Sequence, residues 1–261
     1  MSATKELIAQ CAAQLFEAEH VRIPIPPLTR EHPELTADDA YAIQLANVNR
    51  LLAQGAVISG KKIGLTSLGM QQLLGVNEPD YGHLFTFMEC ACDVPADALM
   101  QPKIEAEIAF VLGRDLPDRE ISAQDVLDCT EYVSAAFEIV DSRVADWKIK
   151  LADTISDNAS SGRYVLGSKR VSPKTLDLTA VTMTTEQAGR GVVSEGIASA
   201  VMGDPAVSVA WLANCLRRYG VSLNKGEVVL SGAFAAALPA AKGDAFTATF
   251  SGLGSVTARF I

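Results

Sequence analysis

The sequence predicts an α+β protein with an N-terminal helical region over residues 1–56 and a continuous β-rich body over residues 57–261. Two patterns support this division. Apolar residues recur at helical spacing in the first part, whereas short β-branched runs bounded by glycine dominate the second. Because the 261-residue chain contains no low-complexity linker, we expect the two parts to form one structural unit.

Three segments have strong helical signals. The first 19 residues carry an apolar stripe, and Thr36 to Asp39 has the form of a capping box before a helix that runs to Gln54. Between these helices, four prolines in residues 22–34 favour an extended connection. The third helix is predicted over residues 205–220, which have a proline at the start and a glycine at the end.

Strands are predicted where β-branched or alternating apolar runs occur. Short helices are expected after Ser67 and near Ser122, and residues 251–254 (SGLG) are expected to join the last two strands as a hairpin. The predicted strands cover residues 57–66, 104–112, 132–140, 227–234, 245–250 and 255–261.

Charge and cysteine content exclude several classes of protein. The formal net charge is −9 and no basic stripe occurs, so we expect no nucleic-acid partner. No apolar run reaches 18 residues, so no membrane span or membrane partner is predicted. The five cysteines form no disulfide or zinc-finger framework, which favours reduced thiols in a cytoplasmic protein.

Two carboxylates interrupt the strand predicted at residues 104–112. Glu105 and Glu107 are two residues apart, so their side chains share one face of the strand. Two buried like charges repel and are costly to desolvate. The face is therefore open to water, paired with Lys or Arg, or occupied by a divalent cation.

A third carboxylate, Glu138, interrupts the strand at residues 132–140, and Asp141 and Arg143 follow it. Two or three carboxylates suit Mg²⁺ or Mn²⁺, which take oxygen ligands and retain water. No histidine is near either cluster, and this argues against Zn²⁺ or a facial-triad iron. Ion pairs with Lys62, Arg143 or Lys148 remain the alternative.

Several long blocks resemble one known family: GKKIGLTS, EPDYGHL, PKIEAEIAFVL, FEIVDSRVADWKIKLADTISDNASSG and GLGSVTARF. The chain is similar to the 2-keto-4-pentenoate hydratase and 4-oxalocrotonate decarboxylase group of the fumarylacetoacetate hydrolase superfamily. The resemblance implies a mixed β-roll with an N-terminal helical region, a catalytic β-rich part over residues 57–261, and a homo-oligomer. Association with a pathway enzyme is a further possibility that the resemblance raises.

The resemblance also assigns roles to individual residues. Glu105, Glu107 and Glu138 match the metal-binding glutamates of the family, whose metal is usually Mg²⁺ or Mn²⁺. Lys62 matches its active-site lysine, and Asp80 and Ser160 match positions that line its substrate pocket. The bland alternatives are an ion pair for Lys62, an Asx turn for Asp80 and simple turn chemistry around Ser160.

The implied chemistry is hydration of a 2-hydroxy-2,4-dienoate, a small molecule of the meta-cleavage catabolism of aromatic compounds. Its carboxylate and 2-oxygen would chelate the metal, and water would add at C4 after proton transfer. Lys62 and Asp80 are the candidates for general acid or base. Nearby cations would lower the pKa of Lys62, and burial would raise the pKa of Asp80.

The residues expected to bind substrate bear on whether the chain catalyses hydration or decarboxylation, the two reactions of this group. Ser161, Arg163 and His83 are predicted to touch substrate, with an ordinary surface or hydrogen-bonded role as the alternative for His83. Asp80 and the segment DWKIKLADT favour a hydratase. The segment SSGRY resembles the decarboxylases, in which Arg163 would bind a second carboxylate, and hydratases more often carry cysteine where Ser161 stands. Decarboxylation of 2-oxo-3-hexenedioate is therefore the alternative.

Two other classes are less consistent with the sequence. A non-catalytic structural partner of such an enzyme would have a broken metal set, whereas all three glutamates are present. A hydrolase that cleaves a C–C bond would need a Glu/His dyad, and the chain has only three histidines.

Overall fold

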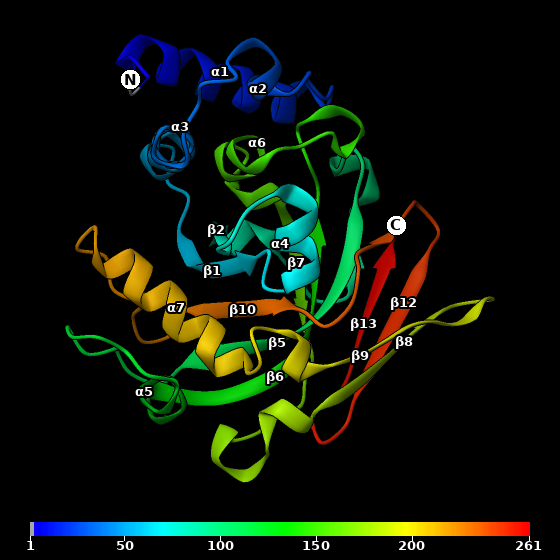
Figure 1. The fold of residues 1–261 in the computed structure, drawn as a ribbon. Coiled ribbons are helices and arrows are strands. Elements are labelled where there is room, and N and C mark those ends of the chain that lie inside the picture. The colour runs from blue at the N-terminus through cyan, green and yellow to red at the C-terminus, as the bar shows by residue number, and fades with distance from the viewer. Residues whose placement is uncertain (1–2) are drawn as a thin grey trace.

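The computed structural model describes residues 3–261, without the side chains of residues 70, 73 and 74. Helices form the N-terminal part, and four α-helices follow within the rest of the described residues (Figure 1). The α-helices are α1 (Lys5–Val21), α2 (Leu28–Glu31), α3 (Ala37–Ala53), α4 (Leu68–Leu74), α5 (Ala123–Cys129), α6 (Leu151–Ser156) and α7 (Pro205–Arg217).

The strands form two sheets. The eight-stranded sheet has the order β2-β1-β10-β5-β6-β7-β3, with β11 also paired to β5, and the five-stranded sheet has the order β4-β13-β12-β8-β9. The strands are β1 (Ile58–Gly64), β2 (Asp80–Phe85), β3 (Glu89–Cys90), β4 (Asp93–Val94), β5 (Lys103–Leu112), β6 (Thr130–Val140), β7 (Ser161–Leu166), β8 (Thr182–Gln187), β9 (Gly191–Ile197), β10 (Val228–Ala233), β11 (Leu238–Pro239), β12 (Ala245–Phe250) and β13 (Gly254–Phe260).

The main hydrophobic core lies on one face of the larger sheet. Alternate residues of β5 and β6, such as Ile108 and Phe137, bury their side chains there with β8, β12, β13 and α7. Because side chains alternate along a strand, the intervening residues of β5 and β6 face the other way. The metal-site candidates belong to this second set, so the fold separates them from the main core.

The N-terminal helices have a second, smaller core. Apolar residues of α1 and α3, including Leu15 and Ile43, pack with Ile155 of α6. The capping box at Thr36 forms as predicted: its hydroxyl accepts from the Asp39 backbone N–H, and Asp39 accepts in return from the backbone N–H of Thr36. In Figure 1 these helices lie at one end of the sheets, above β1 and β2.

The mixed α/β architecture confirms the predicted fold class, and most predicted elements are present. The three long helices, the strand pair β5–β6 and the hairpin of β12 and β13 occur where expected. Several elements differ from the sequence-based expectation. The connection over residues 22–34 was expected to be extended, but it contains the short helix α2, whose residues Leu28–Glu31 lie between Pro27 and Pro33. The segment starting at Asp80 is strand β2 after its turn, the residues after Ser160 form β7, and the β8–β9 hairpin was not predicted individually.

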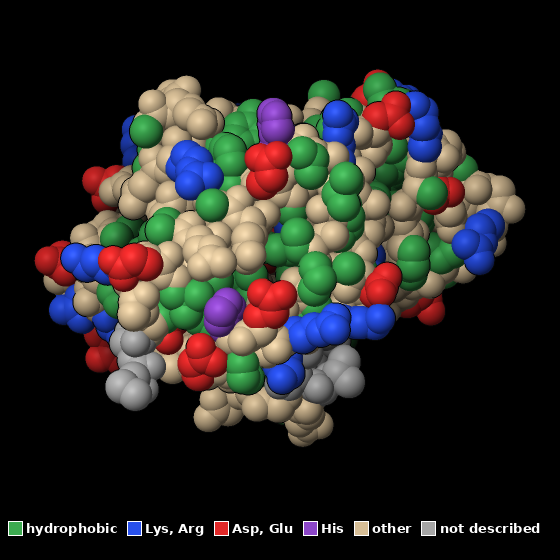
Figure 2. Space-filling view, turned by 90° about the horizontal axis from the view of Figure 1, so that it is seen from above, with side chains coloured by type: hydrophobic (Ala, Val, Ile, Leu, Met, Phe, Trp, Pro, Cys, Tyr) green, Lys and Arg blue, Asp and Glu red, His purple; other side chains and the backbone are tan. Residues whose placement is uncertain are grey.

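Charged groups of both signs are dispersed over the face that carries the N-terminal helices, and no continuous basic surface is visible there (Figure 2). None of the helices within residues 3–261 combines the length and apolar character needed to cross a membrane. The five cysteines are free thiols, as the sequence predicted.

Candidate active site

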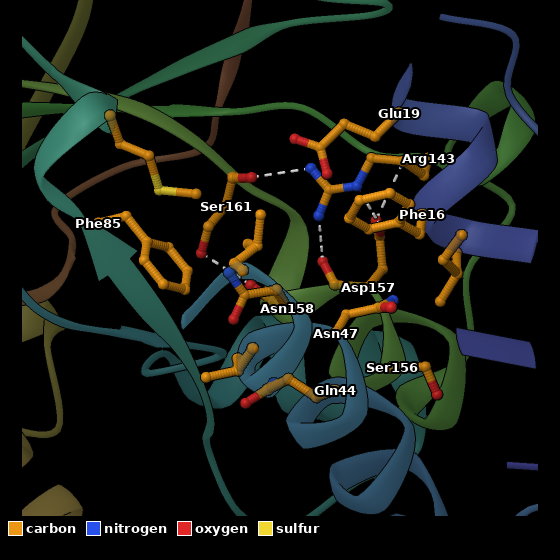
Figure 3. Close-up of a pocket in the computed structure, with 14 residues that line it drawn as sticks. Phe16, Glu19, Gln44, Asn47, Phe85, Arg143, Ser156, Asp157, Asn158 and Ser161 are labelled. Carbon is orange, nitrogen blue, oxygen red and sulfur yellow. Dashed lines mark hydrogen bonds and ion pairs between the residues drawn. The ribbon is translucent and has the colours of Figure 1, made fainter. Parts of the chain in front are cut away.

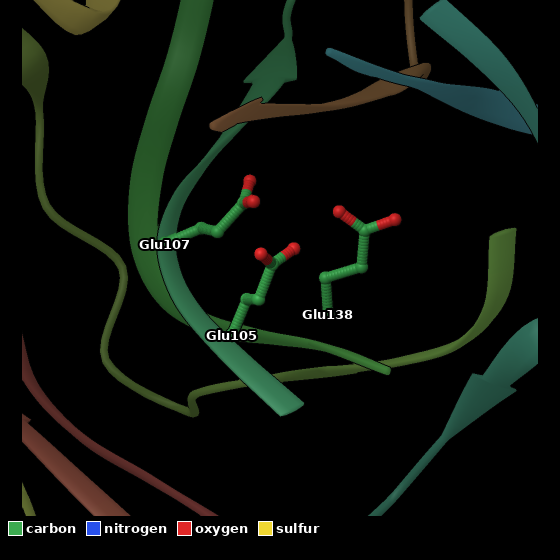
Figure 4. A group of neighbouring side chains, drawn as sticks. All are labelled: Glu105, Glu107 and Glu138. Atoms are coloured by element: carbon green, nitrogen blue, oxygen red, sulfur yellow. The ribbon is translucent and has the colours of Figure 1, made fainter. Parts of the chain in front are cut away.

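Three glutamates converge from two adjacent strands. Glu105 of β5 lies directly opposite Glu138 of β6 in the antiparallel ladder, and Glu107 follows two residues along β5. One carboxylate oxygen from each residue lies within 4.8 Å of the others (Figure 4). Glu138 is distant from the other two in sequence, but strand pairing brings all three together, because paired residues and i+2 neighbours share one face of a sheet.

Burial makes this cluster electrostatically costly. Glu107 and Glu138 are each 1% exposed. Desolvation, followed by repulsion from Glu138, raises the pKa of Glu105 to about 7 and raises the pKa of Glu107 well above its ordinary value. The Gly232 backbone N–H donates to Glu107 at 2.8 Å and offsets only part of this. The three carboxylates thus require a compensating positive charge.

Lys62 of β1 supplies some of that charge. Its Nζ lies 3.1 Å from Glu138 Oε1, but the atoms are not aligned as a hydrogen bond, and both oxygens of Glu138 have no hydrogen-bond partner. Burial would lower the pKa of Lys62, but Glu138 and Asp80 outweigh it and raise the pKa. The expectation of a lowered lysine pKa is therefore wrong for the protein alone.

The cluster fits a hard divalent cation. One lysine cannot neutralise three carboxylates, and the oxygens of Glu138, which accept no hydrogen bond from the described residues, lie close to those of Glu105 and Glu107. Two or three carboxylates with room for water are the ligand set that Mg²⁺ and Mn²⁺ accept. The donor set contains no nitrogen or sulfur, so softer transition metals fit less well.

Asp80 lies on β2, the neighbour of β1, and is paired with Gly64. The side chain is 1% exposed and accepts a hydrogen bond from the Thr154 hydroxyl at 3.3 Å. Burial raises its pKa, as predicted, although Lys62 opposes the shift. A Cβ at position 64 would lie 2.2 Å from Asp80 Oδ1, so the glycine allows the carboxylate to occupy this position.

Ser160 is held at the cavity by an unusual backbone segment. Asn158, Ala159 and Ser160 all have positive φ, between 50° and 55°, and each such non-glycine residue costs about 1–2 kcal/mol. The Asn158 side chain compensates by exchanging two hydrogen bonds with the backbone of His83, at 2.7 and 2.9 Å. Strain retained at this point is consistent with a functional constraint on Ser160.

A buried ion pair supports the same segment from behind. Arg143 Nε donates to Asp157 Oδ1 at 2.5 Å, and Asp157 Oδ2 accepts from the Ser160 hydroxyl at 3.2 Å. Arg143 also donates to the backbone carbonyls of Asp141 and Ser161. The pair thus fixes both the loop and the direction of the Ser160 hydroxyl. Sequence reasoning had offered Arg143 only as a partner for the glutamates.

Lys62, Asp80, Glu105, Glu107 and Ser160 line one cavity of about 610 Å³. Its polar part lies beside the carboxylate cluster, because Glu105 and Glu107 line the cavity and Glu138 lies within 4.8 Å of them. The walls toward the outside are largely apolar and come from three segments that sequence reasoning did not assign to the site. These are residues 63–69, residues 140–149 and residues 233–237, and they contribute Leu65, Val140, Trp147, Ile149, Ala233, Phe234, Ala235, Ala236 and Ala237.

Ser161 does not line that cavity. Its hydroxyl donates to the backbone carbonyl of Asn158 at 2.7 Å. The residue borders a separate, smaller pocket between α1, α3 and the Arg143–Asp157 pair (Figure 3). The adjacent serines therefore line different cavities. The position of Ser161 does not support its predicted contact with substrate.

His83 also lies away from the cavity. It is three residues from Asp80 on β2, so the two side chains leave the strand on opposite faces. Its Nδ1 lies 3.1 Å from Gln44 Oε1, and the Gln44 amide nitrogen already donates to two carbonyls. His83 therefore donates from Nδ1, and burial and Lys61 lower its pKa to about 3. This is the ordinary hydrogen-bonded role.

Arg163, like Ser161 and His83, was predicted to bind substrate but does not line the cavity. Its guanidinium carbon lies 6.0 Å from the centre of the Phe87 ring, and Nη1 donates to the Gly162 carbonyl. Arg163 is paired with Ile139, the neighbour of Glu138, so it lies on the opposite face of the sheet from the glutamates. The position gives no support to a role in binding a second carboxylate.

Comparisons with known proteins identify the family to which the chain is related. Residues 84–261 match the family model for the C-terminal part of fumarylacetoacetate hydrolase. The chain is 47% identical over 253 residues to 2-keto-4-pentenoate hydratase of Paraburkholderia xenovorans (strain LB400), covering 96% of this chain and 94% of that protein. It is 44% identical over 260 residues to 2-hydroxyhexa-2,4-dienoate hydratase of Comamonas testosteroni, covering 98% of both chains.

A solved structure gives the same fold over the whole chain. The 4-oxalocrotonate decarboxylase from Pseudomonas putida G7, complexed with magnesium and adipate, superposes with a TM-score of 0.95. The sequences are 36% identical, and the match covers 100% of this chain and 99% of that one.

Proposed function

The chain belongs to the fumarylacetoacetate hydrolase family, and we propose that it is a metal-dependent hydratase acting on a 2-hydroxy-2,4-dienoate of the 2-oxo-4-pentenoate type. The product is a 4-hydroxy-2-oxo acid. The observation that carries the proposal is the convergence of Glu105, Glu107 and Glu138 beside a cavity of about 610 Å³, which Glu105 and Glu107 line. Full-length relatives of 44–47% identity bear the names of hydratases of this class.

Glu105, Glu107 and Glu138 would hold a divalent cation, Mg²⁺ or Mn²⁺. When bound, it supplies a Lewis acid that favours the 2-oxo form of the substrate. It also provides the positive charge that an acidic protein needs locally to bind an anionic substrate. Support for a divalent cation comes from the magnesium in the related decarboxylase structure and from the all-oxygen ligand set.

The protein's own residues would move the protons. Asp80 is buried at the cavity wall, and its raised pKa favours a protonated carboxyl that can deliver a proton to the far end of the dienol. Lys62 lies beside Glu138, whose charge raises the pKa of Lys62, so this lysine would stay cationic and stabilise negative charge on the reacting oxygens. Protonation of the dienol carbon gives an enone, which is the form that accepts water at C4.

Ser160 would position the water or the substrate carboxylate. Its hydroxyl can donate to Asp157 at 3.2 Å, which leaves its oxygen lone pairs available to the cavity that Ser160 lines. The strained backbone and the buried ion pair prevent this hydroxyl from relaxing away. A nucleophilic role for Ser160 has less support, because no histidine is among the described residues that line the cavity.

Decarboxylation of 2-oxo-3-hexenedioate is the second candidate. It is favoured by the close match to the decarboxylase structure that contains adipate, a dicarboxylate. The placement of Arg163 outside the cavity removes one of the reasons for it. The chain is expected to work in the catabolism of aromatic compounds by either reaction, and a homo-oligomeric state remains part of the proposal.

The experiment supplies 2-hydroxypenta-2,4-dienoate and 2-oxohex-3-enedioate separately to the Mg²⁺-loaded protein. Loss of the dienol absorbance with formation of 4-hydroxy-2-oxopentanoate, dependent on the cation, supports hydration. Release of CO₂ from the diacid without any hydration of the monoacid would reverse the ranking of the two reactions.

A further inference from the structure

Asp80 is held by a side chain from another element. Thr154 of α6 is 5% exposed, lines the 610 Å³ cavity together with Asp80, and donates from its hydroxyl to Asp80 Oδ2 at 3.3 Å. A threonine hydroxyl within a helix commonly donates to the carbonyl of the preceding turn. The Thr154 hydroxyl instead donates from α6 to β2, to the carboxyl group that we assign as the proton donor.

The two carboxyl oxygens of Asp80 have different surroundings. Oδ2 is bonded to Thr154, whereas Oδ1 lies over Gly64, where an added Cβ would be 2.2 Å from this oxygen and 3.5 Å from Lys62 Nζ. Oδ1 therefore lies toward the lysine and Oδ2 toward α6. Because threonine is branched at Cβ, few rotamers are open to it, and the direction of its hydroxyl is well defined. The hydrogen bond at Oδ2 thus restricts rotation of the carboxyl group.

A glutamine from α3 links the same two elements. Gln44 is 1% exposed, and its amide nitrogen donates to the Tyr81 carbonyl at 3.0 Å and to the Ile155 carbonyl at 2.8 Å. These carbonyls belong to the residues that directly follow Asp80 and Thr154 in the sequence. One amide group therefore ties β2 to α6 next to the contact between their side chains.

The Gln44 amide is itself held in one orientation. Its oxygen accepts from Nδ1 of His83 at 3.1 Å, so its nitrogen faces the two carbonyls. Loss of either contact would leave a buried polar group unpaired, which is costly. The N-terminal helical part thereby reaches the active site through Gln44, and His83 supports it from the same strand as Asp80.

We propose that Thr154 is a positioning residue for proton transfer: its hydroxyl orients the Asp80 carboxyl group toward the substrate, and Gln44 keeps α6 and β2 at the separation that this contact requires. The inference rests on the proposed function, because it takes Asp80 as the group that delivers the proton. Proton transfer depends on the direction of the donor, so a carboxyl group that is free to rotate delivers its proton less often. Thr154 exchanges no proton itself, and its effect requires Asp80.

The test is a double-mutant cycle. The values of kcat and KM for hydration of 2-hydroxypenta-2,4-dienoate are measured with Mg²⁺ for the wild type, Thr154→Val, Asp80→Asn and the double variant. Valine keeps the branched shape of threonine and removes the hydroxyl. Thr154→Val should lower kcat about tenfold with KM within about twofold of the wild type, and Asp80→Asn should lower kcat by about 10²–10⁴. The double variant should be no slower than Asp80→Asn, because Thr154 acts through Asp80.

Two further variants separate positioning from folding. Thr154→Ser keeps a hydroxyl and should retain most of the wild-type kcat. Thr29→Val is the matched control, because the Thr29 hydroxyl donates to Asp153 Oδ2 of the same helix at 2.7 Å, and neither residue lines the cavity. Asp153 keeps the backbone N–H groups of Thr29 and Lys150 as donors, so Thr29→Val should leave kcat unchanged. Calorimetry should give the same affinity for Mg²⁺ in Thr154→Val and the wild type.

Several results would overturn the proposal. An unchanged kcat in Thr154→Val would remove its basis, and losses that multiply in the double variant would mean that Thr154 acts independently of Asp80. A serine variant as slow as Thr154→Val, or a Thr29→Val variant as slow, would assign the effect to the packing of α6. Weaker Mg²⁺ binding in Thr154→Val would assign it to the glutamate cluster.

The proposed function fails or stands separately. If the wild type releases CO₂ from 2-oxohex-3-enedioate and hydrates no dienoate, the hydratase proposal fails. The same cycle is then measured for that reaction, because the dienolate left by the departing CO₂ must also take up a proton, and its additivity decides the role of Thr154. A wild type that acts on neither acid would overturn both proposals.

Discussion

Glu107→Gln should stabilise the metal-free protein while abolishing its stabilisation by Mg²⁺. The substitution keeps the shape of the side chain, and the amide oxygen can still accept from the Gly232 N–H. It removes one of three carboxylates whose oxygens lie within 4.8 Å of one another. Glu107 therefore lowers the stability of the protein when the cation is absent and binds the cation when it is present.

The expected size follows from this geometry. Two unit charges 4.8 Å apart repel by about 3–4 kcal/mol at an effective dielectric constant near 20. Lys62 offsets part of this repulsion, and burial together with repulsion from Glu138 raises the pKa of Glu107. We expect a net gain of about 1–2 kcal/mol for the metal-free variant, or roughly 2–8 °C in Tm for a chain of this size.

Thermal unfolding with and without Mg²⁺ measures both effects. The wild type should gain about 2.7 kcal/mol at a cation concentration 100 times Kd, and the variant should gain far less. The chelator-treated wild type and variant provide the baseline. A variant that is less stable than the wild type without metal, and that is still stabilised by Mg²⁺, would refute the assignment of Glu107 as a ligand.

Three further predictions concern residues around the site. Because His83 is held neutral with a pKa of about 3 against about 6.5 when unfolded, stability should fall as pH drops below 6.5, by about 2 kcal/mol at pH 5. Urea unfolding at several pH values should show this loss of stability in the wild type but not in His83→Gln. The same dependence of the free energy of unfolding on pH in both proteins would contradict the prediction. Ser160→Ala should lower kcat/KM for hydration at least about tenfold, whereas the matched Ser161→Ala should leave kcat/KM unchanged. A larger loss in Ser161→Ala than in Ser160→Ala would contradict the assignment of Ser160 to the active site. Lys62→Met should reduce kcat by roughly 10²–10⁴ while calorimetry still detects Mg²⁺ binding, and full activity would exclude Lys62 from the chemistry.

Periodicity predicted the parts of the fold in which one face is strongly apolar. The strand at residues 104–112 was recognisable because apolar residues flank its two glutamates, and the helix after Thr36 was recognisable from its cap. The strand β7 could not be recognised from the sequence, since residues 157–162 are polar, end in glycine and are typical of a loop. Its pairing with β6 overrides that local preference.

The metal cluster was predictable in part, because Glu105 and Glu107 lie on one strand, but alternation alone could not place Glu138 opposite them. Register between distant strands does that, and only the family resemblance supplied it at the sequence level. The face of a strand also decided which neighbours reach the cavity. His83 and Arg163 lie close in sequence to site residues and leave their strands on the other side.

The roles of Arg143 and Asp157 could not be read from the sequence, because they depend on a buried contact behind a left-handed turn. Asp80 and Thr154 are 74 residues apart and meet only through the fold.

The central claim is that the glutamate cluster serves a hydration reaction. The most direct measurement identifies the product when the Mg²⁺-loaded protein is given 2-hydroxypenta-2,4-dienoate, followed by nuclear magnetic resonance. We predict stoichiometric 4-hydroxy-2-oxopentanoate, lost on treatment with a chelator and in Glu107→Gln. Unchanged dienoate, together with CO₂ release from 2-oxohex-3-enedioate by the same preparation, would contradict the account.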